Sequence, residues 1–165
     1  MFRNSAFVFA FILLLTSNTL ADQTDPEFAM QDVREFVEAM GFVESRGLDI
    51  SKGIESSSGL WRIVIEEGEG PKPRSRNSVT VHTTGWLADG TKFWSSRDGE
   101  GEALVNKVTG FVPGFTEGLR TMSAGGTSLF VLPGSLGYGP GGNPGAGIPP
   151  NATLIFEIEL IAIEE

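Results

Sequence analysis

The sequence predicts an α+β fold in which antiparallel strands pack against one short helix. Three observations lead to this fold class. Apolar and polar residues alternate with a period of two over 78–87 and 152–163, as in strands with one buried face. A short segment with helical spacing follows Pro113, and turn-forming residues separate the segments. The 165 residues are enough for one packed domain without disulfide or metal cross-links.

Residues 1–21 have the pattern of a secretory signal peptide. Arg3 gives a positive start, residues 6–15 are apolar, and Thr19 and Ala21 are the small residues that precede cleavage. The apolar run is about half the length of a membrane-spanning helix of roughly 20 residues. We therefore expect cleavage after Ala21 and an exported protein, periplasmic or secreted, that does not span a membrane once the signal is removed.

Residues 22–59 are predicted to form a short N-terminal helix and a linker. Apolar residues recur there at helical spacing, namely Val33, Phe36, Val37 and Met40. Gly41 is a plausible end of the helix, and the serines of 56–58 favour a flexible connection. The helix is either an arm for homodimerisation or substrate contact, or it packs on its own domain. We favour packing, because a short isolated helix is marginally stable, and nothing in the sequence supports a homodimer.

Residues 60–165 carry the predicted strands, the first of which is Trp61–Glu66. In Ser78–Leu87, one face presents Val79, Val81, Thr83 and Gly85, and the other presents Thr80, His82, Thr84 and Trp86. Asp89-Gly90 predicts a tight hairpin with a returning strand over 91–95. Residues 98–107 are expected to form a loop or an irregular edge.

The second half of this region begins with a predicted helix. Pro113 suits a first helical turn, and Phe115, Leu119 and Met122 then share one face. A strand follows over Thr127–Leu132, and then a loop over 133–151 that contains seven Gly and five Pro. The last strand, 152–163, turns Leu154, Phe156, Ile158 and Leu160 to one side and Glu157 and Glu159 to the other.

Composition excludes most catalytic chemistries. The chain has no Cys and one His, which excludes disulfides, thiolate zinc sites, Cys nucleophiles and His-rich metal sites. A net charge of -9 argues against binding nucleic acid. The single His82 is interpreted as a hydrogen-bonded structural residue rather than a catalytic one. We expect neither a cofactor nor a metal.

One reaction suits an aromatic-rich chain that has few candidate acids or bases. Rotation about an X–Pro amide breaks no bond and moves no proton, yet its barrier is about 18–20 kcal/mol because the planar amide is stabilised by resonance. The twisted amide has less charge separation than the planar one. An apolar pocket with a few hydrogen-bond donors therefore favours the twisted form.

The sequence resembles the FKBP-type peptidyl-prolyl cis–trans isomerases over roughly residues 60–163. The resemblance lies in four ordered motifs: VHTTG at 81–85, LADGTKF at 87–93, VPGFTEGL at 112–119, and LGYG at 136–139 followed by IPPNATLIFE at 148–157. It implies a twisted antiparallel sheet of about five strands wrapped around one short helix. It also implies proline-containing polypeptides as substrates.

The resemblance assigns roles to individual residues. It implies that the Val112 N–H and the Tyr138 hydroxyl bind substrate carbonyls above Phe115 at the pocket floor, although Tyr138 has the alternative role of a loop anchor. The remaining pocket residues that it implies are Thr83, Phe93, Trp94, Leu104, Phe111, Ile148 and Phe156.

The chain departs from the family pattern at three positions, of which the first two are among the residues just named. Thr83 stands where the family usually has Tyr, Trp94 where it has Asp, and Glu102 where an aromatic residue is common. These departures leave two functions open. One is an isomerase acting on exported chains; the other is a catalytically weak module that binds peptides as a chaperone.

Overall fold

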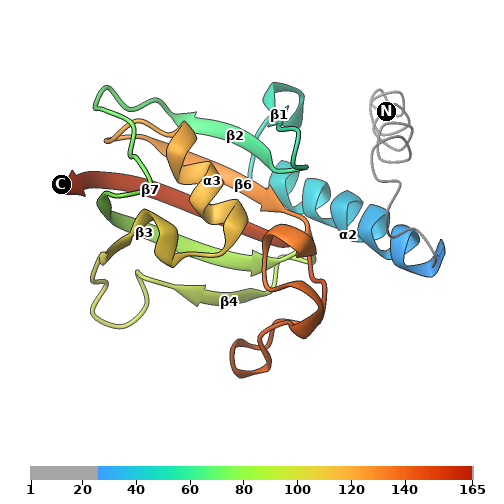
Figure 1. Ribbon diagram of the computed structural model, residues 1–165. Helices are drawn as coiled ribbons and strands as arrows, with labels where there is room; N and C mark the ends of the chain where they lie inside the picture. The colour runs from blue at the N-terminus through green and yellow to red at the C-terminus, as the bar shows by residue number, and fades with distance from the viewer. Residues whose placement is uncertain (1–25, 165) are drawn as a thin grey trace.

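The computed structural model describes residues 26–164, which form one antiparallel sheet with a helix on each face (Figure 1). The strand order is β1–β2–β6–β7–β3–β4, and β5 pairs with β3. The strands are β1 (Ile54–Glu55), β2 (Trp61–Glu66), β3 (Ser78–Leu87), β4 (Lys92–Ser95), β5 (Leu104–Lys107), β6 (Thr127–Leu132) and β7 (Leu154–Glu164). The helices are α2 (Pro26–Ser45) and α3 (Pro113–Thr121). The predicted α+β class is confirmed.

The described residues contain seven strands, so the expectation of about five was too low. The two additional strands are short edge pieces. β1 lies in the stretch predicted as linker, and β5 lies in the stretch predicted as a loop or irregular edge. Neither has a clear alternating pattern, because both are largely exposed and pair along only two to four residues.

The inner face of the sheet forms the main core under α3. Burial alternates along β3, with Val79, Val81 and Thr83 inward, as the pattern predicted. In β7, Leu154, Phe156, Ile158 and Leu160 are buried together with Phe115, Leu119 and Met122 of the α3 segment. The register joins β3 to β7 along ten residue pairs, so the two longest strands form the centre of the sheet.

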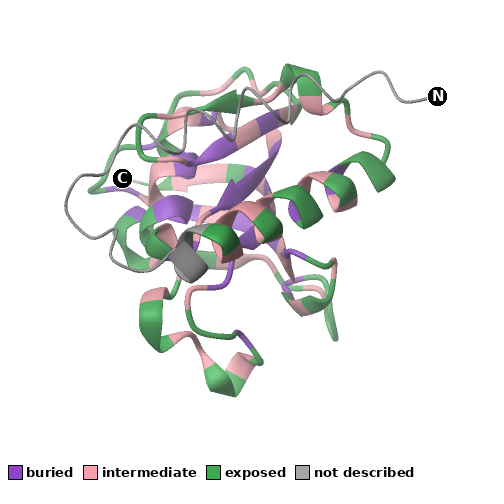
Figure 2. Ribbon diagram, turned by 90° about the vertical axis from the view of Figure 1, so that its right-hand side faces the viewer, coloured by how far each residue is buried: buried purple, intermediate pink, exposed green. Residues whose placement is uncertain are grey.

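The outer face is covered by α2, which packs on its own domain as the favoured interpretation expected. Ala39 and Val43 are fully buried against a second cluster that includes Ile63, Leu129 and Ile155. This explains why Ile155 is buried although it points away from the inner core. Figure 2, seen from the right-hand side of Figure 1, shows that the part of α2 turned away from the sheet is exposed or half-buried.

Polar contacts hold α2 on the sheet near the middle of the helix and just after its last residue. A Glu35 carboxylate oxygen accepts a hydrogen bond from the Thr153 N–H at 2.6 Å. Arg46 forms an ion pair with Glu157 at 2.6 Å, and its guanidinium lies 4.6 Å from the Trp86 ring centroid. Burial, together with the neighbouring Glu35 carboxylate, raises the pKa of Asp32 above its ordinary value.

The helix continues past Gly41, which the sequence suggested as its end. An added Cβ at Gly41 has no heavy atom within 4 Å, and the residue is exposed. We therefore expect Gly41→Ala to raise the free energy of unfolding by about 0.5–1 kcal/mol, because alanine loses less backbone entropy in a helix. Urea denaturation measures this change, and an unchanged or lower midpoint would contradict helical geometry at Gly41.

The predicted signal peptide, residues 1–21, lies outside the described residues. Within residues 26–164, none of the helices combines the length and the apolar character needed to span a membrane.

Candidate active site

The residues at the N-terminus of α3 favour the start of a helix at this point. Pro113 occupies the first turn, and Val112 before it is extended, with φ -58° and ψ 154°. The Val112 carbonyl accepts from the Thr116 N–H at 3.0 Å. Gly114 and Gly118 face Leu132 and Phe130 so closely that a Cβ at either position lies under 3.0 Å from the facing side chain. The helix therefore sits close to the sheet and holds Phe115 over its inner face.

Four aromatic rings form a continuous row across this face. Phe111 stacks on Phe115 with centroids 4.3 Å apart. Phe115 meets Phe156 edge-on at 5.3 Å, and Phe156 meets Phe93 edge-on at 5.7 Å. Phe111 directly follows the 3₁₀ turn Val108–Gly110, and the other three rings come from α3, β7 and β4. We call these four residues the aromatic row.

The two middle rings of the row are buried, and the two terminal rings are partly exposed to solvent. Phe115 is 2% exposed and Phe156 is also buried, whereas the terminal rings of Phe111 and Phe93 are half-buried. Val112 and Leu104 are half-buried beside the row, and Ile148 is buried. Phe111, Val112 and Phe93 are therefore the parts of this surface that solvent reaches, and Phe115 and Phe156 lie behind them.

The long loop over 133–151 folds as three 3₁₀ turns, η3 (Gly134–Leu136), η4 (Gly139–Gly141) and η5 (Pro144–Ala146). Asn143 and Ile148 exchange backbone hydrogen bonds of 2.9 and 3.0 Å, which close the last turn. Gly134 has no room for a side chain, since its Cβ would lie 2.3 Å from the Asn151 carbonyl oxygen. This fold buries Ile148 in the inner core and leaves Tyr138 38% exposed.

Three polar groups at the site have no hydrogen-bond partner among residues 26–164. They are the Val112 N–H, the Tyr138 hydroxyl and the Thr83 hydroxyl. The Thr83 hydroxyl is buried on the inner face of β3, where a lone polar group is destabilising. The Val112 and Tyr138 groups are the two donors that the family resemblance implies for substrate carbonyls, and neither has an acceptor among the described residues.

A hollow of about 500 Å³ lies at the Phe93 end of the row. Its wall consists of Phe93, Trp94, Ser95, Ser96, Asp98, Gly99, Glu100, Gly101 and Glu102. Residues 95–101 were missed as site residues because their polar, glycine-rich composition indicated only a loop. Trp94 is 41% exposed and lines the hollow, but it makes none of the ring contacts that define the aromatic row.

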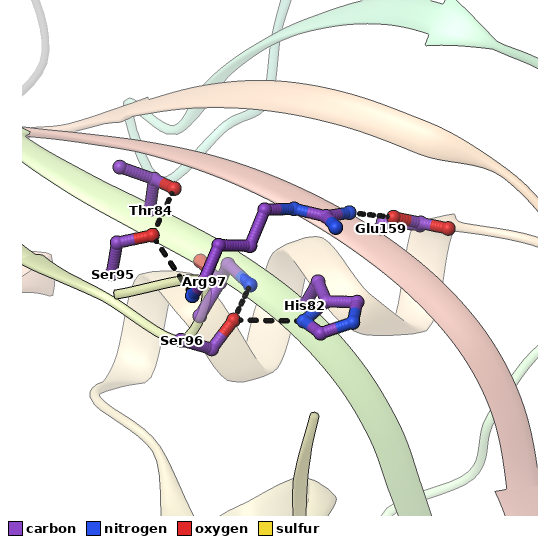
Figure 3. Close-up of polar contacts among 7 residues, drawn as sticks. His82, Thr84, Ser95, Ser96, Arg97 and Glu159 are labelled. Carbon is purple, nitrogen blue, oxygen red and sulfur yellow. Dashed lines mark hydrogen bonds and ion pairs between the residues drawn. The ribbon is translucent and has the colours of Figure 1, made fainter. Parts of the chain in front are cut away.

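The beginning of the hollow's wall is tied to the outer side of β3 and β7 (Figure 3). Ser96 Oγ lies 3.0 Å from His82 Nδ1 and accepts from the Thr83 N–H at 3.0 Å. Ser95 Oγ lies 2.7 Å from Thr84 Oγ1. Arg97 pairs with Glu159 across the strands. His82 thus has the structural hydrogen bond that the sequence led us to expect.

Gly85 provides the space in which two rings of the row meet. A Cβ at this position would lie 2.4 Å from Phe93 Cζ and 2.9 Å from Phe156 Cε1. We expect Gly85→Ala to displace Phe93, to lower the free energy of unfolding by about 1–3 kcal/mol through overpacking, and to weaken peptide binding. Denaturation and peptide titration measure the two effects. Unchanged binding together with unchanged stability would contradict the described ring packing.

Known proteins resemble this chain in sequence and in fold. The sequence profile described as FKBP-type peptidyl-prolyl cis-trans isomerase matches residues 70–161. The FKBP-type peptidyl-prolyl cis-trans isomerase FkpA of Aeromonas hydrophila is 47% identical over 109 residues, which are 66% of this chain and 39% of that protein. The chain thus spans about two fifths of that relative.

A shorter relative and a solved structure match more completely. The FK506-binding protein of Neisseria meningitidis serogroup B is 41% identical over 102 residues, covering 61% of this chain and 93% of that protein. The crystal structure of a peptidyl-prolyl cis-trans isomerase from Pseudomonas syringae superimposes with a TM-score of 0.70 and 27% identity, covering 88% of this chain and all of that chain.

Proposed function

The chain belongs to the family of FKBP-type peptidyl-prolyl cis-trans isomerases, and from this premise we propose that it accelerates rotation about X–Pro amides in exported polypeptides. The observation that carries the proposal is the aromatic row, which is open at Phe111 and Phe93 and flanked by two unpaired donors. Rotation about the amide needs no acid, base or metal.

The proposed mechanism follows from the charge distribution of the amide. The substrate proline lies against Phe111, Val112 and Phe93, where few waters can solvate the planar, charge-separated amide. The twisted amide has less charge separation and is favoured in this surrounding. A rate gain of about a million-fold corresponds to only about 8 kcal/mol of this preference.

Two donors would hold the substrate backbone during the rotation. The Val112 N–H points from the start of α3 and has no acceptor among the described residues. The Tyr138 hydroxyl, on the exposed part of the long loop, would bind a second carbonyl. Phe115, Phe156 and Ile148 support the wall from behind, and Thr83, Trp94 and Leu104 complete its edge.

The second candidate function is a module that binds proline-containing segments with little catalysis. It is favoured by the near-complete burial of Phe115 and by the departures from the family pattern at Thr83 and Trp94. Placement in the periplasm or outside the cell is proposed for either function and rests on the signal pattern of residues 1–21.

One assay separates the two functions. A short X–Pro peptide with leucine before proline is brought to a non-equilibrium cis content, and its relaxation is followed with micromolar protein. An isomerase shortens the relaxation in proportion to protein concentration. A module that binds the same peptide in calorimetry but leaves the relaxation unchanged would exclude the isomerase and leave the chaperone function.

A further inference from the structure

The hollow beside Phe93 is adjacent to the aromatic row but is not part of it. Phe93 belongs to both, since it lines the hollow and also packs edge-on against Phe156 at 5.7 Å. A peptide whose proline lies against the row therefore has a neighbouring residue within reach of the hollow. A volume of about 500 Å³ accommodates a long side chain.

The wall of the hollow carries uncompensated negative charge. Asp98, Glu100 and Glu102 line it, and its wall includes no Lys, Arg or His. Asp98 is neutralised by Lys92 at 2.7 Å. Within residues 26–164, Glu100 and Glu102 make no ion pair or hydrogen bond, and both are exposed.

The remaining cation on this segment points elsewhere. Arg97 extends along the outer side of the sheet and pairs with Glu159 (Figure 3). The two cations of residues 92–102 are thus both occupied by other acids. The charge at Glu100 and Glu102 is left for a group from outside the chain.

A further feature of the wall, the exposed Trp94, favours a cationic side chain. Trp94, 41% exposed, has no cation over its ring among the described residues, whereas Trp86 and Phe130 are each covered by an arginine. An indole face attracts ammonium and guanidinium groups.

The segment is also held in place before a ligand arrives. Ser95 and Ser96 are buried and bonded to Thr84, His82 and Thr83 (Figure 3). Fixing the start of the wall lowers the conformational entropy that binding must remove.

We propose that this hollow binds the side chain of a lysine or arginine that immediately precedes the substrate proline. The inference rests on the proposed isomerase function and adds its substrate class: polypeptide segments in which a basic residue stands before proline. The ammonium or guanidinium lies between Glu100 and Glu102, with its alkyl stem along Trp94.

The test compares acetyl-Ala-X-Pro-Phe-amide peptides with Lys, Leu or Glu at X. For the native chain we expect kcat/KM for the Lys peptide to exceed that for the Glu peptide about five-fold, the combined effect of two exposed charge pairs. The preference should shrink as salt is raised, because exposed charges are screened. The Leu peptide measures isomerase activity without any charged side chain.

Glu100→Gln combined with Glu102→Gln should reduce the Lys-to-Glu ratio to about two-fold or less, with the Leu rate unchanged. Glu66→Gln combined with Glu69→Gln is the matched control, because it removes the same charge near the end of β2, four strands away from β4. The control should retain the full preference.

The outcomes separate the two proposals. Equal Lys and Glu rates with an active Leu peptide would refute the basic-residue subsite and leave the isomerase standing. If both double variants lose the preference for the Lys peptide equally, the preference is due to overall charge. This result would also refute binding of the basic side chain in the hollow. If no peptide is accelerated, the proposed function fails and the subsite fails with it.

Discussion

Replacing Phe115 with alanine is expected to lower kcat/KM for an X–Pro peptide about 100-fold. Phe115 is 2% exposed, stacks on Phe111 and meets Phe156 edge-on, so it supports both neighbouring rings. Its loss removes the support behind Phe111, against which the proposed mechanism places the substrate proline. The same change should lower the free energy of unfolding by about 3–5 kcal/mol, since a large buried ring leaves a cavity.

Activity must therefore be measured under conditions in which the variant is folded, as judged by circular dichroism. Phe42→Ala is the matched control, because Phe42 is a half-buried ring that packs on Trp86 across the outer face. It should lose stability and retain kcat/KM within about two-fold. Equal activity losses in the two folded variants would place the site elsewhere.

The second large effect concerns the outer face. Val43→Glu places a carboxylate at a fully buried position between α2 and the sheet. An unpaired buried charge costs about 3–5 kcal/mol, so we expect α2 to detach from the sheet or the whole fold to be lost. Limited trypsin digestion at Arg34 and Arg46, together with urea denaturation, measures the change.

Val37→Glu is the control on the same helix, because Val37 is 45% exposed. It should change the free energy of unfolding by no more than about 0.5 kcal/mol. Similar losses at Val37 and Val43 would contradict the described orientation of α2.

The longer elements were predictable because their burial repeats along the chain. β2, β3 and β6 have the predicted bounds, and in β3 inward Val79 and Val81 alternate with outward Thr80 and His82. The length of α2 was not predictable, because a glycine such as Gly41 commonly ends a helix, whereas here it lies within α2 on the exposed side. Where α2 docks depends on Ile63, Leu129 and Ile155, which are far from it in sequence.

The site was predictable in its rings and not in its shape. Phe93, Phe111, Phe115 and Phe156 do meet on one face, because β4, α3 and β7 bring them together. Neither the burial of Phe115 nor the hollow beside Trp94 could be predicted from the residue pattern. The burial of Phe115 depends on its packing with Phe111 and Phe156. The hollow depends on how the start of the 95–102 segment is held against β3, through contacts such as Ser96 with His82.

The decisive measurement is the relaxation rate of the uncharged leucine–proline peptide with the full chain between pH 5.5 and 8.5. Since the proposed rotation moves no proton, the acceleration should be large and nearly constant over this range, within about two-fold. No acceleration, or an acceleration that titrates with an apparent pKa near that of histidine, would contradict catalysis by an apolar aromatic surface alone.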